Sequence, residues 1–276
     1  MTQSSSKSND CGEGAFASGN LPSLNDLPPV LAAENIRTGE RVQIDWGLDS
    51  VDVPANKRMR FHHNIIDLEQ RLSVYATDDE VHLNTQTSSQ WDGFNHFAHQ
   101  ESKVYYGGVK HEDLHSGKID KAERNSMHKW CLNGEIIKEV LKWQKTELRT
   151  GDVLLLRTGV VRWFEQASDE EKMKGLIEND NFPGIEATEE VKRWIWNSHF
   201  AAVASDNMSF EFGPHGDLWL HEWILPMFGC PIGELFDLER LSQACQKHQR
   251  WTFFLTSAPI RVEGGIASSP NAICIF

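Results

Sequence analysis

Long hydrophobic runs are absent from this chain of 276 residues. Its apolar stretches are short segments such as Val153–Leu156, whereas a membrane-spanning helix needs about 20 apolar residues. The first twenty residues, MTQSSSKSNDCGEGAFASGN, lack the apolar stretch of a secretory signal. We therefore expect a soluble, cytoplasmic protein in which residues 1–20 form a disordered polar arm and residues 21–276 form a single domain.

Cysteine is sparse, and its spacing argues against disulfide-stabilised domains and cysteine zinc domains. The five cysteines are scattered and form no C-x-x-C pair; they are Cys11, Cys131, Cys230, Cys245 and Cys274. An odd, unpatterned set argues against both a disulfide framework and a cysteine zinc site. We expect buried apolar residues or free thiols at these positions.

Positive charge is also in short supply, with 27 Lys and Arg against 40 Asp and Glu, a net charge of −13. Such a chain repels phosphate backbones and anionic lipids, so nucleic acids and membrane surfaces are not expected partners. Neither a phosphate-binding glycine loop nor a G-x-S-x-G nucleophile elbow occurs. Nucleotide-dependent chemistry is therefore disfavoured.

Hydrophobic patterning predicts one α/β domain, because helix-periodic segments alternate with short apolar strands. Ten tryptophans supply a large apolar core. The predicted helices are 135–145, 187–196 and 238–247. The predicted strands are 41–46, 81–87, 152–158, 200–204, 251–256 and 259–262.

One group of potential acid–base residues follows the predicted strand 81–87. Asp92 and His96 lie four residues apart, Gln86 and Gln90 precede them, and small residues between them allow close approach to a ligand. By themselves, an aspartate and a histidine in a loop fit a hydrogen-bonded turn equally well.

A second group lies downstream, where His221 and Glu234 occur in an apolar and aromatic segment. A buried, unpaired carboxylate costs several kcal/mol, so Glu234 needs an arginine, protonation or a metal ion. His221 by itself fits either a metal ligand or a hydrogen-bonded core histidine.

The segment NTQTSSQWDGFNHFAHQ (84–100) resembles the cyclase family that includes kynurenine formamidases and isatin hydrolases. The family signature is H-x-G-T-H-x-D-x-P-x-H. On this chain its first two histidines fall on Gln86 and Gln90, its aspartate on Asp92 and its last histidine on His96. The SQWDG sequence is similar to a fungal-type branch of the family.

A second block, LHEWILPMFGCPIGELFDLERL (220–241), resembles the family's downstream block and aligns His221 and Glu234 with its later metal ligands. DVLLLRTG, FPGI, VASDN and APIRVEGGIASSPNAI resemble further blocks in the family order. The resemblance extends from about Leu21 to the C-terminus. It implies a swivelling β/β/α fold and a homo-oligomer, a dimer or larger.

The resemblance also implies a site. One divalent metal would be held by Asp92, His221 and Glu234, with neutral carbonyl oxygens from Gln86 and Gln90. An oxygen-rich set with one imidazole favours Mn²⁺, with Zn²⁺ as an alternative. The catalytic residues would be Asp92 and His96, with His96 as general base and then acid. The expected pocket walls are Trp91, Phe94, Trp219 and Trp223.

The resulting hypothesis is a metal-dependent hydrolase of a small cyclic amide, lactone or formamide, acting in secondary metabolism. One alternative is a lyase, dehydratase or cyclase that acts without hydrolysis. Another is a non-catalytic family remnant, because two segments of the relatives are missing here. One lies between Val30 and Ile36, and the other is a G-R-G-V-L-L-D strand after Trp130.

Overall fold

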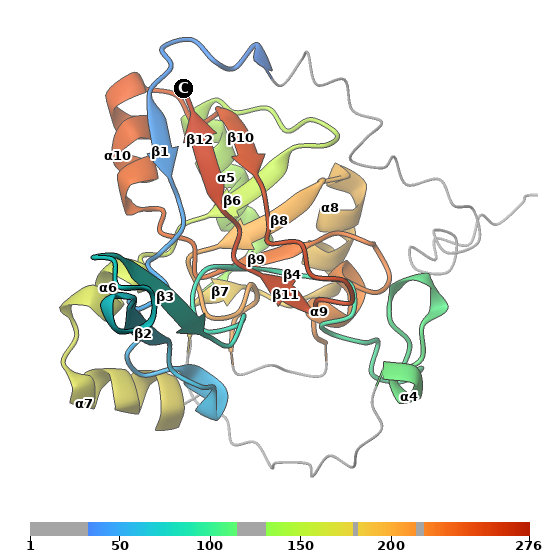
Figure 1. Ribbon diagram of the computed structural model, residues 1–276. Coiled ribbons are helices and arrows are strands. Elements are labelled where there is room, and N and C mark those ends of the chain that lie inside the picture. Colours follow the sequence, from blue (N-terminus) through green and yellow to red (C-terminus); the bar gives the residue numbers. More distant parts are fainter. Residues whose placement is uncertain (1–32, 115–130, 179–181, 214–217) are drawn as a thin grey trace, which may run out of the picture.

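The computed structural model describes residues 33–114, 131–178, 182–213 and 218–276 (Figure 1). The predicted polar arm at residues 1–20 lies outside these ranges. So do Cys11, the segment around Val30, and Trp130. No helix within the described ranges is long and apolar enough to cross a membrane.

A five-stranded sheet forms the centre of the fold. Its strand order is β11-β4-β9-β8-β6, with β6, β8 and β9 parallel and with β4 and β11 antiparallel to their neighbours. The apolar β6 sequence VLLL suits a strand that is covered on both faces. The strands are β4 (Gln90–Asp92), β6 (Val153–Leu156), β8 (Ala202–Ser205), β9 (Ile232–Glu234) and β11 (Ala267–Ser268).

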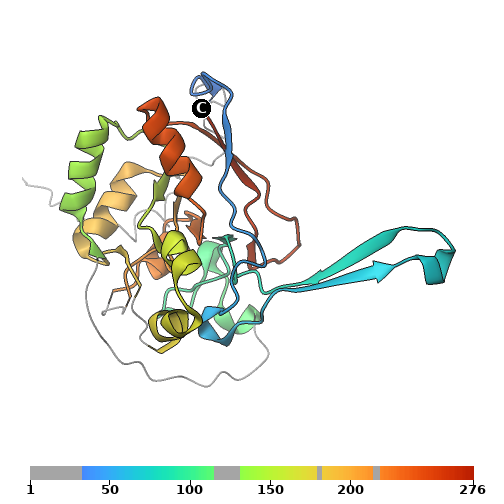
Figure 2. The same ribbon diagram turned by 90° about the vertical axis from the view of Figure 1, so that its left-hand side faces the viewer.

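Helices cover one face of this sheet, as Figure 2 shows for α5 and α8. Leu154, Val203 and Ile232 of the sheet share one buried cluster with Val191 and Ile224 of the helices. The side chains of a strand alternate between faces, so every second residue of the strand reaches this cluster. The covering helices are α5 (Gly134–Gln144), α8 (Glu189–Ser198) and α9 (His221–Ile224).

A second, antiparallel sheet covers the opposite face. Leu155 and Ala204 of the central sheet pack there with Phe236, Cys274 and Phe276. The chain is therefore layered as sheet, sheet and helices, and the expected single α/β domain with β/β/α layers is confirmed. The second layer holds β1 (Arg41–Gln43), β10 (Phe254–Ser257), β12 (Ala272–Ile275) and, beside them, α10 (Glu239–His248).

The remaining elements are short and lie around these layers. A two-stranded hairpin projects from the body (Figure 2) and consists of β2 (His62–Asp67), α3 (Glu69–Leu72) and β3 (Thr77–His82). A parallel pair is formed by β5 (Cys131–Leu132) and β7 (Gly184–Ile185). The others are η2 (Ala55–Lys57), η3 (Tyr106–Gly108), α4 (His111–Leu114), α6 (Val160–Gln166), α7 (Asp169–Lys172) and η4 (Met173–Glu178).

All three predicted helices are present, and side chains accept hydrogen bonds from the first backbone amides of two of them. The Thr188 hydroxyl accepts a hydrogen bond from the Val191 amide at the start of α8. An Asp237 oxygen accepts one from the Glu239 amide at the start of α10, 3.1 Å away. Each side chain satisfies a backbone amide that lacks a partner inside its helix.

Two predicted strands are wrong. The alternation at 81–87 belongs to the end of β3 and to a turn, in which the Asn84 carbonyl and side chain accept from the Thr87 and Gln86 amides. Residues 259–262 form no strand, and the sequence reading missed β12, the central strand of the second sheet. A period of two in a short segment does not distinguish a strand from a polar turn.

The thiols behave as expected where they are described. Cys230, Cys245 and Cys274 are free and buried. Burial raises the pKa of Cys230 to about 12 and that of Cys245 to about 11. These thiols are therefore apolar packing groups and not nucleophiles at neutral pH.

Gly184 lets two backbone segments approach closely, and one of them carries a residue of the site described below. A Cβ atom at Gly184 would lie 2.4 Å from the carbonyl carbon of Glu211 and from the nitrogen of Phe212. A hydrogen bond from the Phe212 amide to the Ile185 carbonyl, 2.8 Å long, holds the two segments together.

We predict that Gly184→Ala lowers the free energy of unfolding by about 2–3 kcal/mol, because the backbone of Glu211 must shift. Gly134→Ala is the control, since its Cβ would meet only an ordinary 3.5 Å contact. That variant should change stability by no more than about 1 kcal/mol. Urea unfolding measures both, and equal effects would contradict the packing assigned to Gly184.

Candidate metal site

Strands β4 and β9 place three polar side chains on the helix-facing side of the central sheet. Gln90 lies directly opposite Glu234 in the antiparallel register, and Asp92 follows two residues after Gln90. Because side chains alternate along a strand, Gln90 and Asp92 share one face. All three side chains are buried.

His221, the first residue of α9, completes the cluster from the helical layer. Its Nε2 atom lies 3.1 Å from Glu234 Oε1 and 3.8 Å from Asp92 Oδ2. The imidazole is buried. The structure thus brings together Asp92, His221 and Glu234, which are separated by up to 142 residues, 92 to 234, along the chain.

Glu211 orients this histidine, and the sequence reading missed it. Its Oε2 atom lies 2.5 Å from His221 Nδ1, and its Oε1 atom accepts a hydrogen bond from the His221 backbone amide. A carboxylate on Nδ1 fixes the ring so that Nε2 faces Asp92 and Glu234. The signal was available, because Glu211 stands between two phenylalanines and needs a partner as much as Glu234 does.

The two glutamines link the carboxylates. Gln86 donates from its amide nitrogen to Asp92 Oδ1, and its own oxygen accepts from Gln90 Nε2 at 3.1 Å. Gln90 Nε2 also donates to Glu234 Oε2 at 2.8 Å. The oxygen of Gln86 is thus already hydrogen-bonded, whereas Gln90 Oε1 is buried without a hydrogen-bond partner.

His96 lies at the margin of the cluster and is only partly buried. Its Nε2 atom is 3.9 Å from Asp92 Oδ2, and its Nδ1 atom is 3.3 Å from Gln86 Nε2. Burial lowers the pKa of His96, and the nearby cations His221 and Arg58 lower it further, against the opposite effect of Asp92. His96 is therefore neutral at pH 7 and can accept a proton.

The buried carboxylates shape the electrostatics of the centre. Burial, and then the charge of Asp92, raise the pKa of Glu234 to about 7. Burial opposes charge on His221, but Glu211 and the other two carboxylates raise its pKa well above the usual range. Burial also opposes charge on Asp92, and the charges of His96 and His221 outweigh it, so its pKa is lowered.

These residues fit a divalent cation. Asp92, His221 and Glu234 each offer one ligand atom, and these atoms lie within 4.8 Å of one another. Asp92 Oδ2 and Gln90 Oε1 are buried acceptors without a hydrogen-bond partner, an unfavourable state that a cation would relieve. The arrangement also supplies more buried carboxylates than cationic groups, which a divalent ion would compensate.

The predicted aromatic walls are only partly found near this cluster. Trp91 is on the other face of β4 from Asp92, against Phe236, and its indole nitrogen donates to Ser257 Oγ. This placement corrects the expectation for Trp91, and the cause is strand alternation. Phe94 instead packs on Tyr106 at the surface, with ring centroids 4.7 Å apart.

The helical side supplies the aromatic neighbours. Phe97, which the sequence reading missed, lies 5.5 Å from His221 and stacks on Trp219, also at 5.5 Å between ring centroids. Trp223 instead packs against His99, with ring centroids 5.5 Å apart, and Lys192 Nζ lies 3.7 Å from the centroid of its ring. Phe97 and Trp219 therefore form the apolar side of the site.

Arg58 is a second residue that the sequence reading missed. Its Nη1 atom donates to the Gln86 carbonyl at 2.9 Å. Its charge lowers the pKa of both His96 and Glu234. It supplies positive charge at the edge of a carboxylate-rich site.

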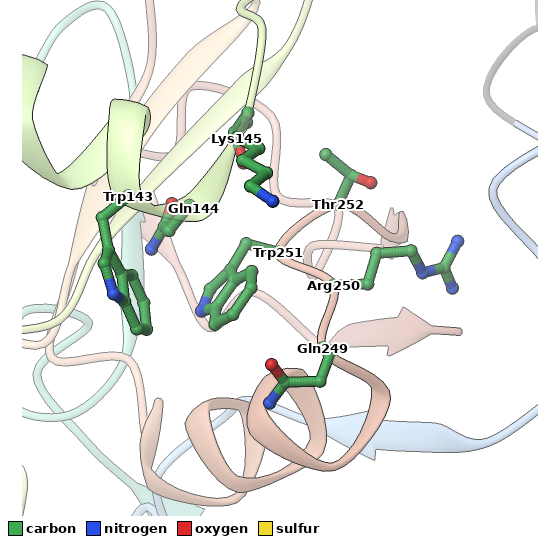
Figure 3. A pocket seen from close by; sticks show the side chains of 8 residues that line it. Trp143, Gln144, Lys145, Gln249, Arg250, Trp251 and Thr252 are labelled. Atoms are coloured by element: carbon green, nitrogen blue, oxygen red, sulfur yellow. The ribbon is translucent and has the colours of Figure 1, made fainter.

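A separate surface pocket of about 460 Å³ contains none of these residues. Figure 3 shows that Trp143 and Trp251 face one another there, beside Lys145 and Arg250. Their ring centroids are 5.0 Å apart. This pocket lies between the end of α5 and the segment after α10, away from the strands that carry the cluster.

An α/β fold with a buried cluster of carboxylates and one histidine is typical of a metal-dependent enzyme. Comparison with family models then gives the family: the Cyclase model matches residues 26–212. The chain belongs to the Cyclase family. The matched range contains Asp92, His96 and Glu211, while His221 and Glu234 follow it.

Solved structures share the fold over nearly the full chain. A novel cyclase is 24% identical with a TM-score of 0.79, and the match covers 93% of this chain and 96% of the other. Isatin hydrolase A from Ralstonia solanacearum is 16% identical, with a TM-score of 0.58 and 99% coverage of both chains. Isatin hydrolase A from Labrenzia aggregata, bound to benzyl benzoate, is 15% identical, with a TM-score of 0.60 and coverage of 91% and 98%.

The two family segments that the sequence is expected to lack adjoin Val30 and Trp130, which both lie outside the described residues, so their absence stays a prediction. A short strand, β5, lies between Trp130 and helix α5. No curated protein sequence matches this chain.

We predict that Glu211→Gln lowers the pKa of His221, because the carboxylate that faces Nδ1 is replaced by a neutral amide. Titration of the histidine ring protons by NMR in metal-free protein measures this. Glu222→Gln is the matched control, because Glu222 is on the same helix but accepts from the Gln100 amide instead. An unchanged His221 titration in Glu211→Gln would contradict the assigned geometry.

Proposed function

We propose that this chain is a metal-dependent hydrolase that acts on a small cyclic amide, lactone or formamide. The observation that carries the proposal is the pair of unpartnered buried oxygens, Asp92 Oδ2 and Gln90 Oε1, within a cluster of carboxylates around His221. Membership of the Cyclase family and a fold shared with isatin hydrolases support it. A small-molecule substrate agrees with the net charge of −13, which disfavours nucleic acids as partners.

Asp92, His221 and Glu234 would hold the ion, and Gln90 offers a neutral oxygen beside them. Gln86 contributes in the same way only if its side-chain amide turns, because its oxygen now accepts from Gln90. Several oxygens with one imidazole favour Mn²⁺, with Zn²⁺ as the alternative. When bound, such an ion polarises a carbonyl and makes water more acidic.

His96 has the position and the protonation state of the general base. It is neutral at pH 7, it is partly open to solvent, and Nε2 faces Asp92. The ring takes a proton from the attacking water and returns it to the nitrogen or oxygen that leaves the carbonyl carbon. The carboxylate of Asp92 stabilises the imidazolium between these two transfers.

The aromatic and cationic neighbours favour a flat substrate that becomes anionic. Phe97 and Trp219 stack beside His221 and offer a planar apolar surface. Hydrolysis of a cyclic amide or lactone opens the ring and releases a carboxylate, and hydrolysis of a formamide releases formate. Arg58, which donates to the Gln86 carbonyl, provides positive charge beside the site for such an anion.

We predict that the chain binds about one divalent ion and that binding stabilises it. A hundredfold excess of Mn²⁺ over its dissociation constant should raise the melting temperature by roughly 5–10 °C, because the ion binds only the folded chain. Asp92→Asn and Glu234→Gln should each abolish this shift, while Glu222→Gln should retain it. Elemental analysis and thermal unfolding measure the two effects.

No stoichiometric ion and no stabilisation by Mn²⁺ or Zn²⁺ would contradict the metal site. Retention of the full shift in Asp92→Asn would contradict the ligand assignment specifically. Both outcomes are independent of the substrate, because the probe is the metal alone.

We further predict that His96→Ala lowers kcat by about 10²–10⁴-fold on isatin, formanilide or a simple lactone, whichever is turned over. The Mn²⁺-dependent stabilisation should persist in this variant, which separates proton transfer from metal binding. Reactions in ¹⁸O-labelled water should place the label in the product carboxylate. An unchanged kcat would remove His96 from the mechanism, and an unlabelled product would favour the lyase or cyclase alternative.

A further inference from the structure

The pocket beside the C-terminal ends of α5 and α10 is a second concave site, and we call it the tryptophan pocket. Residues 143–146 and 249–252 line it. Its volume of about 460 Å³ falls within the range of pockets that hold small molecules. None of the metal-site residues contributes to it, so a ligand there would be independent of the metal site.

Two indole rings form the apolar part of the tryptophan pocket. Trp143, near the end of α5, is 69% exposed. Trp251 is half-buried, because it also packs against the core between the two sheets. The planes of the two rings meet at 63°, and Figure 3 shows the rings side by side. An exposed pair of indoles offers face and edge contacts to another flat ring.

The polar part of the pocket offers positive charge and hydrogen-bond donors. Lys145 forms no ion pair within the described residues, and Figure 3 shows its ammonium group pointing toward Trp251. Arg250 adds a second positive charge, with its Nη1 atom donating to the Asn35 carbonyl at 2.8 Å. No acidic side chain occurs among the described residues that line the pocket.

The backbone at the two helix ends reduces the negative charge that a cation would otherwise meet there. The last carbonyls of a helix lack partners inside it and carry partial negative charge. Lys145 after α5 and Gln249 after α10 both have a left-handed backbone conformation. The amide of each donates to two carbonyls of the preceding turn, so these carbonyls are already occupied.

We propose that the tryptophan pocket binds a small, flat aromatic carboxylate. The ring of the ligand would lie against Trp143 and Trp251, and its carboxylate would pair with Lys145 Nζ. An aromatic cation would also gain from the indole faces, but the positive charges of Lys145 and Arg250 would repel it. In a chain with a net charge of −13, a pocket lined by cations and no acids attracts an anion locally.

The test uses 2-naphthoate as the probe, with binding measured by isothermal titration calorimetry on the full chain. The metal is left out, so that the carboxylate cannot coordinate it. We expect a dissociation constant of about 1 mM or below, as for a ligand of this size in a surface pocket. Neutral 2-naphthamide and cationic 2-naphthylmethylammonium should each bind about tenfold more weakly or worse, because neither can pair with Lys145.

Substitutions in the pocket locate the bound probe. Trp143→Ala removes one wall and Lys145→Gln removes the charge, and each should raise the dissociation constant of 2-naphthoate about tenfold or more. Tyr75→Ala is the control for the first, as an exposed aromatic residue outside the pocket. Lys142→Gln is the control for the second, as an exposed lysine of α5 that does not line the pocket. Both controls should stay within about twofold of the unmodified chain.

Four results would overturn the proposal. The first is no binding of 2-naphthoate at about 10 mM, and the second is equal affinity for the three probes. The third is an affinity that Trp143→Ala and Lys145→Gln leave unchanged while Asp92→Asn alters it, which would place the probe at the metal site. The fourth is a lower mass of Trp143→Ala than of the unmodified chain in sedimentation equilibrium, which would show that a second copy covers the pocket. Far-ultraviolet circular dichroism confirms that each variant retains its fold.

Discussion

Three buried carboxylates surround one buried imidazole at the centre of the fold. Asp92, Glu211 and Glu234 lie in a protein interior where charge is costly, and His221 is the one buried cation that they share. Burial, and then the negative charge of Asp92, raise the pKa of Glu234 to about 7. A divalent cation would compensate the negative charge of the carboxylates, and the unpartnered oxygens of Asp92 and Gln90 mark where it is needed.

The fold delivers each member of this cluster from a different element. The β4 and β9 register sets Gln90 against Glu234, and alternation along β4 puts Asp92 on the same face and Trp91 on the other. Helix α9 brings His221 in from the covering layer, and the close approach at Gly184 holds the segment that carries Glu211. Strand pairing, helix packing and the absence of a side chain at Gly184 therefore determine the geometry of the cluster together.

The sequence predicts the layers and most of the cluster. Helical periodicity locates α5, α8 and α10, and the family resemblance singles out Asp92, His221 and Glu234. The sequence marks Glu211 only as an acid between two phenylalanines that needs a partner, and the fold is required to identify His221 as that partner. The sequence does not show that Trp91 and Asp92 lie on opposite faces of a strand, because β4 is only three residues long and its side-chain alternation cannot be distinguished from a loop. The projecting hairpin of β2 and β3 is also not predicted, because strands exposed on both faces, such as TDDEVH, lack hydrophobic alternation.

If the buried cluster is a metal site, a crystal of this chain soaked in Mn²⁺ should show an anomalous difference peak in contact with Asp92, His221 and Glu234. Glu211 should remain on the far nitrogen of the His221 ring. Crystals of Asp92→Asn, soaked in the same way, should lose the peak. An empty cluster in the soaked crystal, with the carboxylates and His221 in their present hydrogen bonds, would show that these residues do not form a metal site.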